Sequence, residues 1–199
     1  MKTVLIVLSC VFTFASALPY IRDIIKGKTK PRVVSWFTWS LLTGIAAVAT
    51  FADHQYAAAV LLLFATFETA AITLLGLRHG DRKFERFDIF CQVGAIVGLI
   101  LWLVFDSPAV AVVATVAIDF VGALPTFKHQ WQKPYEETWS AFFLAALGAI
   151  CTVAATTKWS VTAVVYPLYI VVANVVGCTI ILMRTKYAVK GEPAEFRDL

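Results

Sequence analysis

Long apolar runs alternate with short charged segments along the whole chain. Seven of these runs have the length, about 17 to 25 residues, at which a helix crosses roughly 30 Å of hydrocarbon. They cover residues 3–21, 33–51, 56–77, 87–105, 109–127, 138–155 and 161–183. Little of the chain is left over for a soluble part. The pattern therefore predicts an all-α integral membrane protein with seven transmembrane helices.

A fragment of the sequence occurs twice, and each copy runs from an apolar helix through a charged loop into a second apolar helix. The copies share a Leu-Pro pair, a Lys-Pro pair and a tryptophan: Leu18-Pro19, Lys30-Pro31 and Trp36, then Leu124-Pro125, Lys133-Pro134 and Trp139. The same register aligns the last run with the third, so that Asn174 falls on Glu68. Runs one to three thus match runs five to seven, which indicates a duplicated unit.

The fourth run, 87–105, has no counterpart and serves as a linker. An odd number of helices per unit would invert a directly fused copy, and one extra helix restores its orientation. The sequence therefore predicts two parallel repeats in a 3+1+3 arrangement. The expected parts are a first repeat at 1–78, an inside loop plus linker helix at 79–107, a second repeat at 108–186 and a cytoplasmic tail at 187–199.

Composition and charge agree with this prediction. Hydrophobic residues make up 60% of the chain and charged residues only 15%, which a soluble domain does not need. Of the 17 Lys and Arg residues, all but Lys2 and Lys158 would lie on one face of the membrane. The positive-inside rule then sets the N-terminus outside and the C-terminus inside. We expect a bacterial-type cytoplasmic membrane with the lipid bilayer as partner, and no nucleic acid; a homo-oligomer stays open.

Residues 1–17 allow two interpretations. A lysine, an apolar stretch and Ala15-Ser16-Ala17 are typical of a cleavable signal peptide. Cleavage there would destroy the first member of the repeat and move five cations to the outside. We therefore expect this segment to be retained as the first helix.

The repeated motif resembles that of a known transporter superfamily. Two three-helix units joined by one helix, with a proline near the inner end of the first helix of each, resemble the SWEET, SemiSWEET and PQ-loop superfamily. The matching positions are Leu18-Pro19-Tyr20, Lys28-Thr29 and Ser35 in the first copy, and Leu124-Pro125-Thr126 and Thr138 in the second. Tyr20 and Thr126 stand where the superfamily pattern has glutamine.

This resemblance implies that Pro19 and Pro125 are hinges for alternating access. A proline inside a helix removes one backbone hydrogen bond and allows a bend. The alternative is that each proline only ends its span at the membrane interface. The resemblance also implies an asparagine on the third helix of a unit in the binding pocket, and Asn174 matches this position.

Three polar side chains lie deep within the predicted spans. Glu68 is close to the middle of its run, where a carboxylate facing lipid would be costly, so we expect it to face the bundle interior or to be protonated. Its partner by repeat is Asn174, and the two form the expected binding pair; a purely structural hydrogen bond is the alternative for Glu68. Asp119 precedes Pro125 by six residues and is the expected modulator or proton site. Trp39 is deep enough to form a pocket wall, and Tyr169 is expected to stack on a ring-shaped solute, with core packing as its alternative.

These residues predict a carrier that moves a small polar solute by alternating access, either passively or coupled to protons. A non-transporting membrane receptor or accessory subunit of the same architecture is the alternative. We expect no enzyme, since only Glu68 and Asp119 within hydrogen-bonding reach would suggest catalysis. No cofactor or metal is expected, because His54, His79 and His129 are assigned to three different loops.

Overall fold

The computed structural model describes residues 2–52, 56–104, 108–156 and 159–189. These residues form seven α-helices and one short 3-10 helix, and the only β-type pairing among them is an isolated bridge between Arg32 and Asp81. The elements are α1 (Lys2–Ile25), α2 (Val33–Ala52), α3 (Tyr56–His79), α4 (Arg86–Val104), α5 (Pro108–Gln132), η1 (Pro134–Glu136), α6 (Trp139–Ala155) and α7 (Val161–Val189). The predicted all-α class is confirmed.

Each predicted apolar run coincides with one helix, but α1, α5 and α7 continue at least one turn beyond the run that predicted them. α1 reaches Ile25, α5 reaches Gln132 and α7 reaches Val189. Pro19 and Pro125 therefore lie inside continuous helices, each with a further helical segment after it. The assignment of His129 and His79 to loops was wrong, because α5 includes His129 and α3 ends at His79. His54, Lys158 and residues 190–199 of the expected tail lie outside the described residues.

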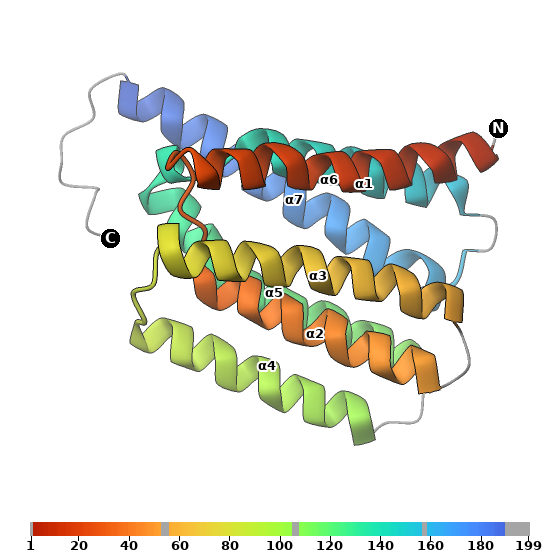
Figure 1. Ribbon diagram of the computed structural model, residues 1–199. Coiled ribbons are helices and arrows are strands. Elements are labelled where there is room, and N and C mark those ends of the chain that lie inside the picture. Colours follow the sequence, from red (N-terminus) through yellow and green to blue (C-terminus); the bar gives the residue numbers. More distant parts are fainter. Residues whose placement is uncertain (1, 53–55, 105–107, 157–158, 190–199) are drawn as a thin grey trace.

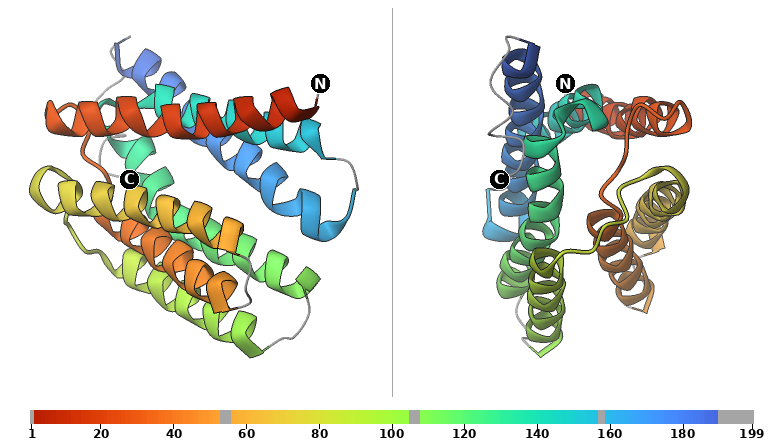
Figure 2. Two further views of the ribbon diagram at one scale, coloured as in Figure 1. Left: turned by 45° about the vertical axis from the view of Figure 1, so that its right-hand side comes forward. Right: turned by 90° about the vertical axis from the view of Figure 1, so that its left-hand side faces the viewer.

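Successive helices run in alternating directions. Figure 1 shows α1, α3, α5 and α7 ending at the left, where α2, α4 and α6 begin. The closest neighbours are α1 with α6, α2 with α3, α6 with α7, α4 with α5, and α5 with α7; α2 also touches α5, and α1 touches α3. α4 lies at one edge of the bundle, as both views in Figure 2 show.

Two glycines allow close approach of helices. A Cβ atom on Gly148 of α6 would lie 2.8 Å from Thr13 Oγ1 of α1, and one on Gly122 of α5 would lie 3.1 Å from a methyl group of Thr38 in α2. Small residues at such positions let helix backbones approach each other. The α1–α6 and α5–α2 contacts therefore both depend on a glycine.

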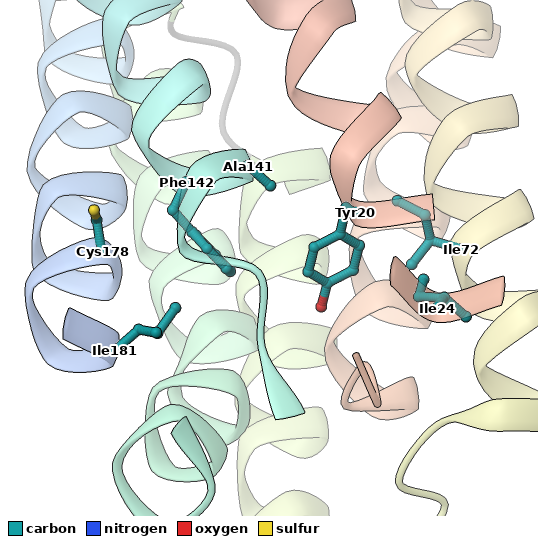
Figure 3. Close-up of a cluster of buried hydrophobic side chains, with 7 residues drawn as sticks. All are labelled: Tyr20, Ile24, Ile72, Ala141, Phe142, Cys178 and Ile181. Atoms are coloured by element: carbon teal, nitrogen blue, oxygen red, sulfur yellow. The ribbon is translucent and has the colours of Figure 1, made fainter. Parts of the chain in front are cut away.

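A small apolar core joins four helices near the end at which α1 finishes (Figure 3). Its buried members are Tyr20, Ile24, Ile72, Ala141, Phe142, Cys178 and Ile181. The Tyr20 ring lies 6.2 Å from that of Phe142 in an edge-to-face arrangement and 5.0 Å from that of Trp36. The edge-to-face pair of Tyr20 and Phe142 is favourable beyond its buried area and connects α1 to α6, and the tilted Trp36 ring adds a contact with α2.

Large apolar side chains are exposed over the outside of the bundle. Phe67, Phe90 and Leu18 are each at least 70% exposed, whereas Ser35, Gln130 and Asp88 are buried. This distribution is the reverse of that in a water-soluble domain. Among the described residues, the segments Lys2–Ile25 and Ala163–Lys186 are long and apolar enough to cross a membrane.

Candidate functional site

A central pocket of about 220 Å³ lies between the helices. Five helices contribute to its wall: α2, α3, α5, α6 and α7. Its lining residues are Trp36, Trp39, Thr43, Thr69, Asp119, Ala123, Thr126, Phe127, Phe142, Tyr166, Tyr169, Ile170, Ala173 and Asn174. Aromatic rings thus surround a few polar groups, which is the usual composition of a small-molecule site.

A short hydrogen bond in this wall joins Asp119 of α5 to Tyr169 of α7. The Tyr169 hydroxyl donates a hydrogen bond of 2.6 Å to Asp119 Oδ2. The ring of Tyr166 lies 6.1 Å from that of Tyr169, so two tyrosines stand beside the carboxyl group. A carboxyl group flanked by rings can bind a hydroxyl, amine or amide group of a solute while the rings cover its apolar face.

A side pocket of about 60 Å³ adjoins the central pocket. Glu68 of α3 and Asn174 of α7 both line it, together with Tyr20, Trp36 and Phe142. Asn174 lines both pockets, and its Nδ2 atom donates a hydrogen bond of 2.9 Å to the Ile170 carbonyl one turn earlier. The side-chain carbonyl oxygen of Asn174 can still accept a hydrogen bond.

The structure thus brings the five predicted binding residues to two adjoining pockets. Trp39, Asp119, Tyr169 and Asn174 line the central pocket, and Glu68 reaches only the side pocket. Trp39 packs edge-to-face on Trp36 at 5.0 Å, and its buried Nε1 atom has no hydrogen-bond partner among the described residues. Glu68 and Asp119 line different pockets, and no hydrogen bond joins them in the described part of the chain.

A hydrogen bond joins Tyr20, which lines the side pocket, to Glu137, and we call this pair of residues the closure. The Tyr20 hydroxyl donates a 2.9 Å hydrogen bond to Glu137 Oε2 and accepts one of 3.2 Å from Trp36 Nε1. Glu137 lies just before α6 and is only 6% exposed. Its burial raises the pKa of the carboxyl group to about 8; the Tyr20 hydrogen bond acts in the opposite direction and the nearby Glu136 adds to the rise.

Beyond this closure lies a network of ion pairs, which we call the charged end. Arg32 at the start of α2 is buried and lies 3.2 Å from Asp81 and 2.5 Å from Asp88. Asp88 also accepts a hydrogen bond from the Glu85 backbone at the start of α4. Lys128 of α5 pairs with Glu85 at 2.6 Å, so α2, α4 and α5 are joined.

His129 is a buried member of the charged end. Its Nδ1 and Nε2 atoms lie 3.4 Å and 3.5 Å from carboxylate oxygens of Asp81 and Glu136. Burial lowers the pKa of His129 to about 4, although both carboxylates act in the opposite direction. The imidazole is therefore neutral near pH 7. No group of three His, Cys, Asp or Glu side chains in the described residues is arranged to hold a metal ion.

Sequence reasoning missed the polar groups of the closure and two other buried polar groups. Tyr20, Ser35, Gln130 and Glu137 are buried, yet no candidate function was given to them. Tyr20 was singled out in the sequence only for its position after Pro19, and its hydroxyl was given no role. Nothing in the sequence marks Glu137 as a buried residue, since it follows another glutamate in a short charged loop.

Comparisons with models of protein families, with curated proteins and with solved structures found no match to this chain. Fold and site together define an all-helical bundle with pockets lined by aromatic rings and a few polar groups, and with its ion pairs at one end.

Proposed function

We propose that this protein is a membrane carrier that moves a small polar solute by alternating access. The observation that carries the proposal is the central pocket: Asp119, Tyr169 and Asn174 face a space between five helices. The Tyr20–Glu137 hydrogen bond would close the bundle between that space and the charged end. A site between helices that carries a few polar groups, beside contacts that can separate, has the geometry that a carrier requires.

Placement of all seven helices in a membrane is part of the proposal. The exposed apolar side chains would face lipid, and the ion pairs among Arg32, Asp81, Glu85 and Lys128 would lie at the interface. The concentration of Lys and Arg in the segments at this end supports its assignment to the inside and the N-terminus to the outside. The protein would then be an integral membrane protein.

The helix contacts support the proposed 3+1+3 repeat. If α1, α2 and α3 correspond to α5, α6 and α7, the α1–α6 contact corresponds to α5–α2, and α2–α3 corresponds to α6–α7. The α1–α3 contact likewise corresponds to α5–α7, while α4 touches only α5 and α2 among the described helices. Two parallel repeats that exchange equivalent contacts would form the central pocket at their junction.

The lining residues restrict the chemistry of the solute. The pocket volume of about 220 Å³ admits a molecule with a single small ring or a short chain. Asp119 and Asn174 favour a solute with hydroxyl, amide or amine groups, and an anion would be disfavoured beside the carboxyl group. The rings of Trp39 and Tyr169 provide stacking surfaces.

Uptake into liposomes that contain the purified full chain tests the proposal. A panel of labelled sugars, nucleosides, amino acids and small amines, with and without a pH gradient, should include a solute that enters faster than into protein-free liposomes. Glu68→Gln and Asn174→Ala should each reduce that uptake by about tenfold, the usual effect of losing one polar contact in a buried site. Phe67→Leu is the matched control, because its side chain is 71% exposed and lines neither pocket.

Failure of every solute to enter would contradict the carrier proposal. If the same protein retained a peptide tightly while transporting nothing, the receptor interpretation would replace it. Uptake that is unchanged in Glu68→Gln and Asn174→Ala would leave a carrier whose solute binds elsewhere.

A further inference from the structure

Glu137 is a buried carboxyl group without a cationic partner. It follows η1 and precedes α6, and its Oε2 atom accepts the hydrogen bond from Tyr20. Its Oε1 atom is buried and has no hydrogen-bond partner among the described residues, and no Lys, Arg or His of that part of the chain pairs with it. A buried carboxylate without a cation is costly, so the neutral acid is favoured in this position.

Few ionisable groups face Glu137. From α1 it meets Tyr20, whose hydroxyl also contacts Trp36 of α2. From η1 it meets Glu136, whose negative charge is opposed by Lys30 at 2.5 Å. The adjacent Thr138 hydroxyl contacts Thr29 and Asp23. None of these groups gives Glu137 a positive neighbour.

Glu137 also lies at a contact between the two proposed repeats. Tyr20 belongs to the first repeat and Glu137 to the second, and the Thr29–Thr138 contact of 2.5 Å joins the same two segments. Opening the pockets toward the charged end requires these contacts to separate. Separation would expose the carboxyl group to water, in which its ionised form is stable.

We propose that Glu137 is the proton-binding residue of this carrier, protonated while the closure at the charged end is intact and deprotonated when that closure opens. The inference rests on the proposed carrier function. On opening, the O–H bond of the acid breaks, the proton passes to water at the charged end, and the carboxylate remains on Glu137. Closing reverses these steps, so each opening releases one proton to the water at the charged end and each closing takes one up from it.

The direction of the pH dependence follows from the two states. The pKa of Glu137 is about 8 when it is buried, against an ordinary value of 4.5 for an exposed glutamate. The closed form thus binds the proton more tightly than the open form does, and it loses stability as pH rises between these values. The ratio of closed to open molecules should fall about tenfold for each pH unit across that window.

A cross-linking experiment tests the inference. Thr29→Cys and Thr138→Cys are introduced together into the full chain, with Cys10, Cys91, Cys151 and Cys178 replaced, and the protein is placed in liposomes. The yield of a short thiol-specific cross-link between the two positions reports the closed form. We expect high yield near pH 5 and progressively lower yield toward about pH 8. With Glu137→Gln the yield should stay high throughout, because glutamine remains neutral.

Two further variants distinguish a proton effect from a structural one. Glu136→Gln changes the neighbouring carboxylate, and the fall in yield with pH should remain. Tyr20→Phe removes the donor that favours the ionised form of Glu137 in the closed state, so the range of pH over which the yield falls should extend to higher pH. Because Tyr20→Phe keeps the carboxyl group, it provides a test even if Glu137→Gln does not fold.

A second cysteine pair controls for thiol chemistry and for the carrier itself. Ser9 and Thr152 contact each other at 2.6 Å at the other end of the α1–α6 pair. Ser9→Cys with Thr152→Cys should keep its yield while the Thr29–Thr138 pair loses it.

A fall with pH that persists in Glu137→Gln overturns the assignment to Glu137. A yield that responds to the transported solute but not to pH overturns proton binding and leaves the carrier intact. No response in either pair, together with no uptake, overturns the carrier proposal and this inference with it.

Discussion

Tyr169 of α7 donates a hydrogen bond of 2.6 Å to Asp119 of α5 in the wall of the central pocket. The bond fixes the carboxyl group and leaves its second oxygen available to a solute. Tyr169→Phe keeps the ring and removes only the donor. We expect it to reduce the initial rate of solute uptake by about tenfold, because a hydrogen bond to a charged group contributes about 1.5–3 kcal/mol. Liposome uptake of the solute identified in the panel measures this effect.

Tyr166→Phe is the control for that change. Tyr166 lines the same pocket beside Tyr169, but no hydrogen bond of its hydroxyl to a described residue is present. Its removal should change uptake less than twofold. Equal losses in both variants would show that ring packing, and not the Asp119 bond, accounts for the effect.

The positions of the helices were predictable because each is a long, mostly apolar run bounded by charged residues. The ends of the helices were less predictable. α5 continues through Pro125 to Gln132 and includes the polar residues Lys128 and His129. Those residues looked like loop in the sequence because they are polar. The charged end satisfies them with partners from distant segments, and no local pattern contains that information.

The candidate site was predictable only in part. Asp119, Glu68 and Asn174 were identified because a polar group within an apolar run is conspicuous. Glu137 and Gln130 were not, because each is surrounded by other polar residues in the sequence. The fold decides which of two adjacent glutamates is buried: Glu136 makes ion pairs at the charged end, and Glu137 turns toward Tyr20.

Substituting the prolines of α1 and α5 should slow transport without lowering the thermal stability of the protein. Pro19 and Pro125 each interrupt the hydrogen-bond ladder of a continuous helix. Pro19→Ala should restore one backbone bond and stiffen α1, so the uptake rate should fall severalfold while the thermal unfolding temperature stays the same or rises. Pro125→Ala should act in the same direction on α5.

Pro167 provides the comparison for these variants. It lies within α7, the third helix of its proposed repeat, and has no counterpart in α3. Pro167→Ala should reduce uptake less than either of the other two changes. An unchanged rate in both Pro19→Ala and Pro125→Ala would contradict the hinge role.

The buried ion pairs of Arg32 predict a large loss of stability. Arg32→Met keeps much of the side-chain volume but leaves Asp81 and Asp88 without their central cation. Removing one member of a buried pair costs about 3–5 kcal/mol, because the remaining charge stays buried. Arg22→Ala is the matched control, since its pair with Asp23 is exposed on the arginine side and should contribute at most about 1 kcal/mol. Denaturant unfolding of both variants in detergent micelles measures the difference. A similar small loss in both would mean that water reaches Arg32, and that the charged end does not hold α2, α4 and α5 together.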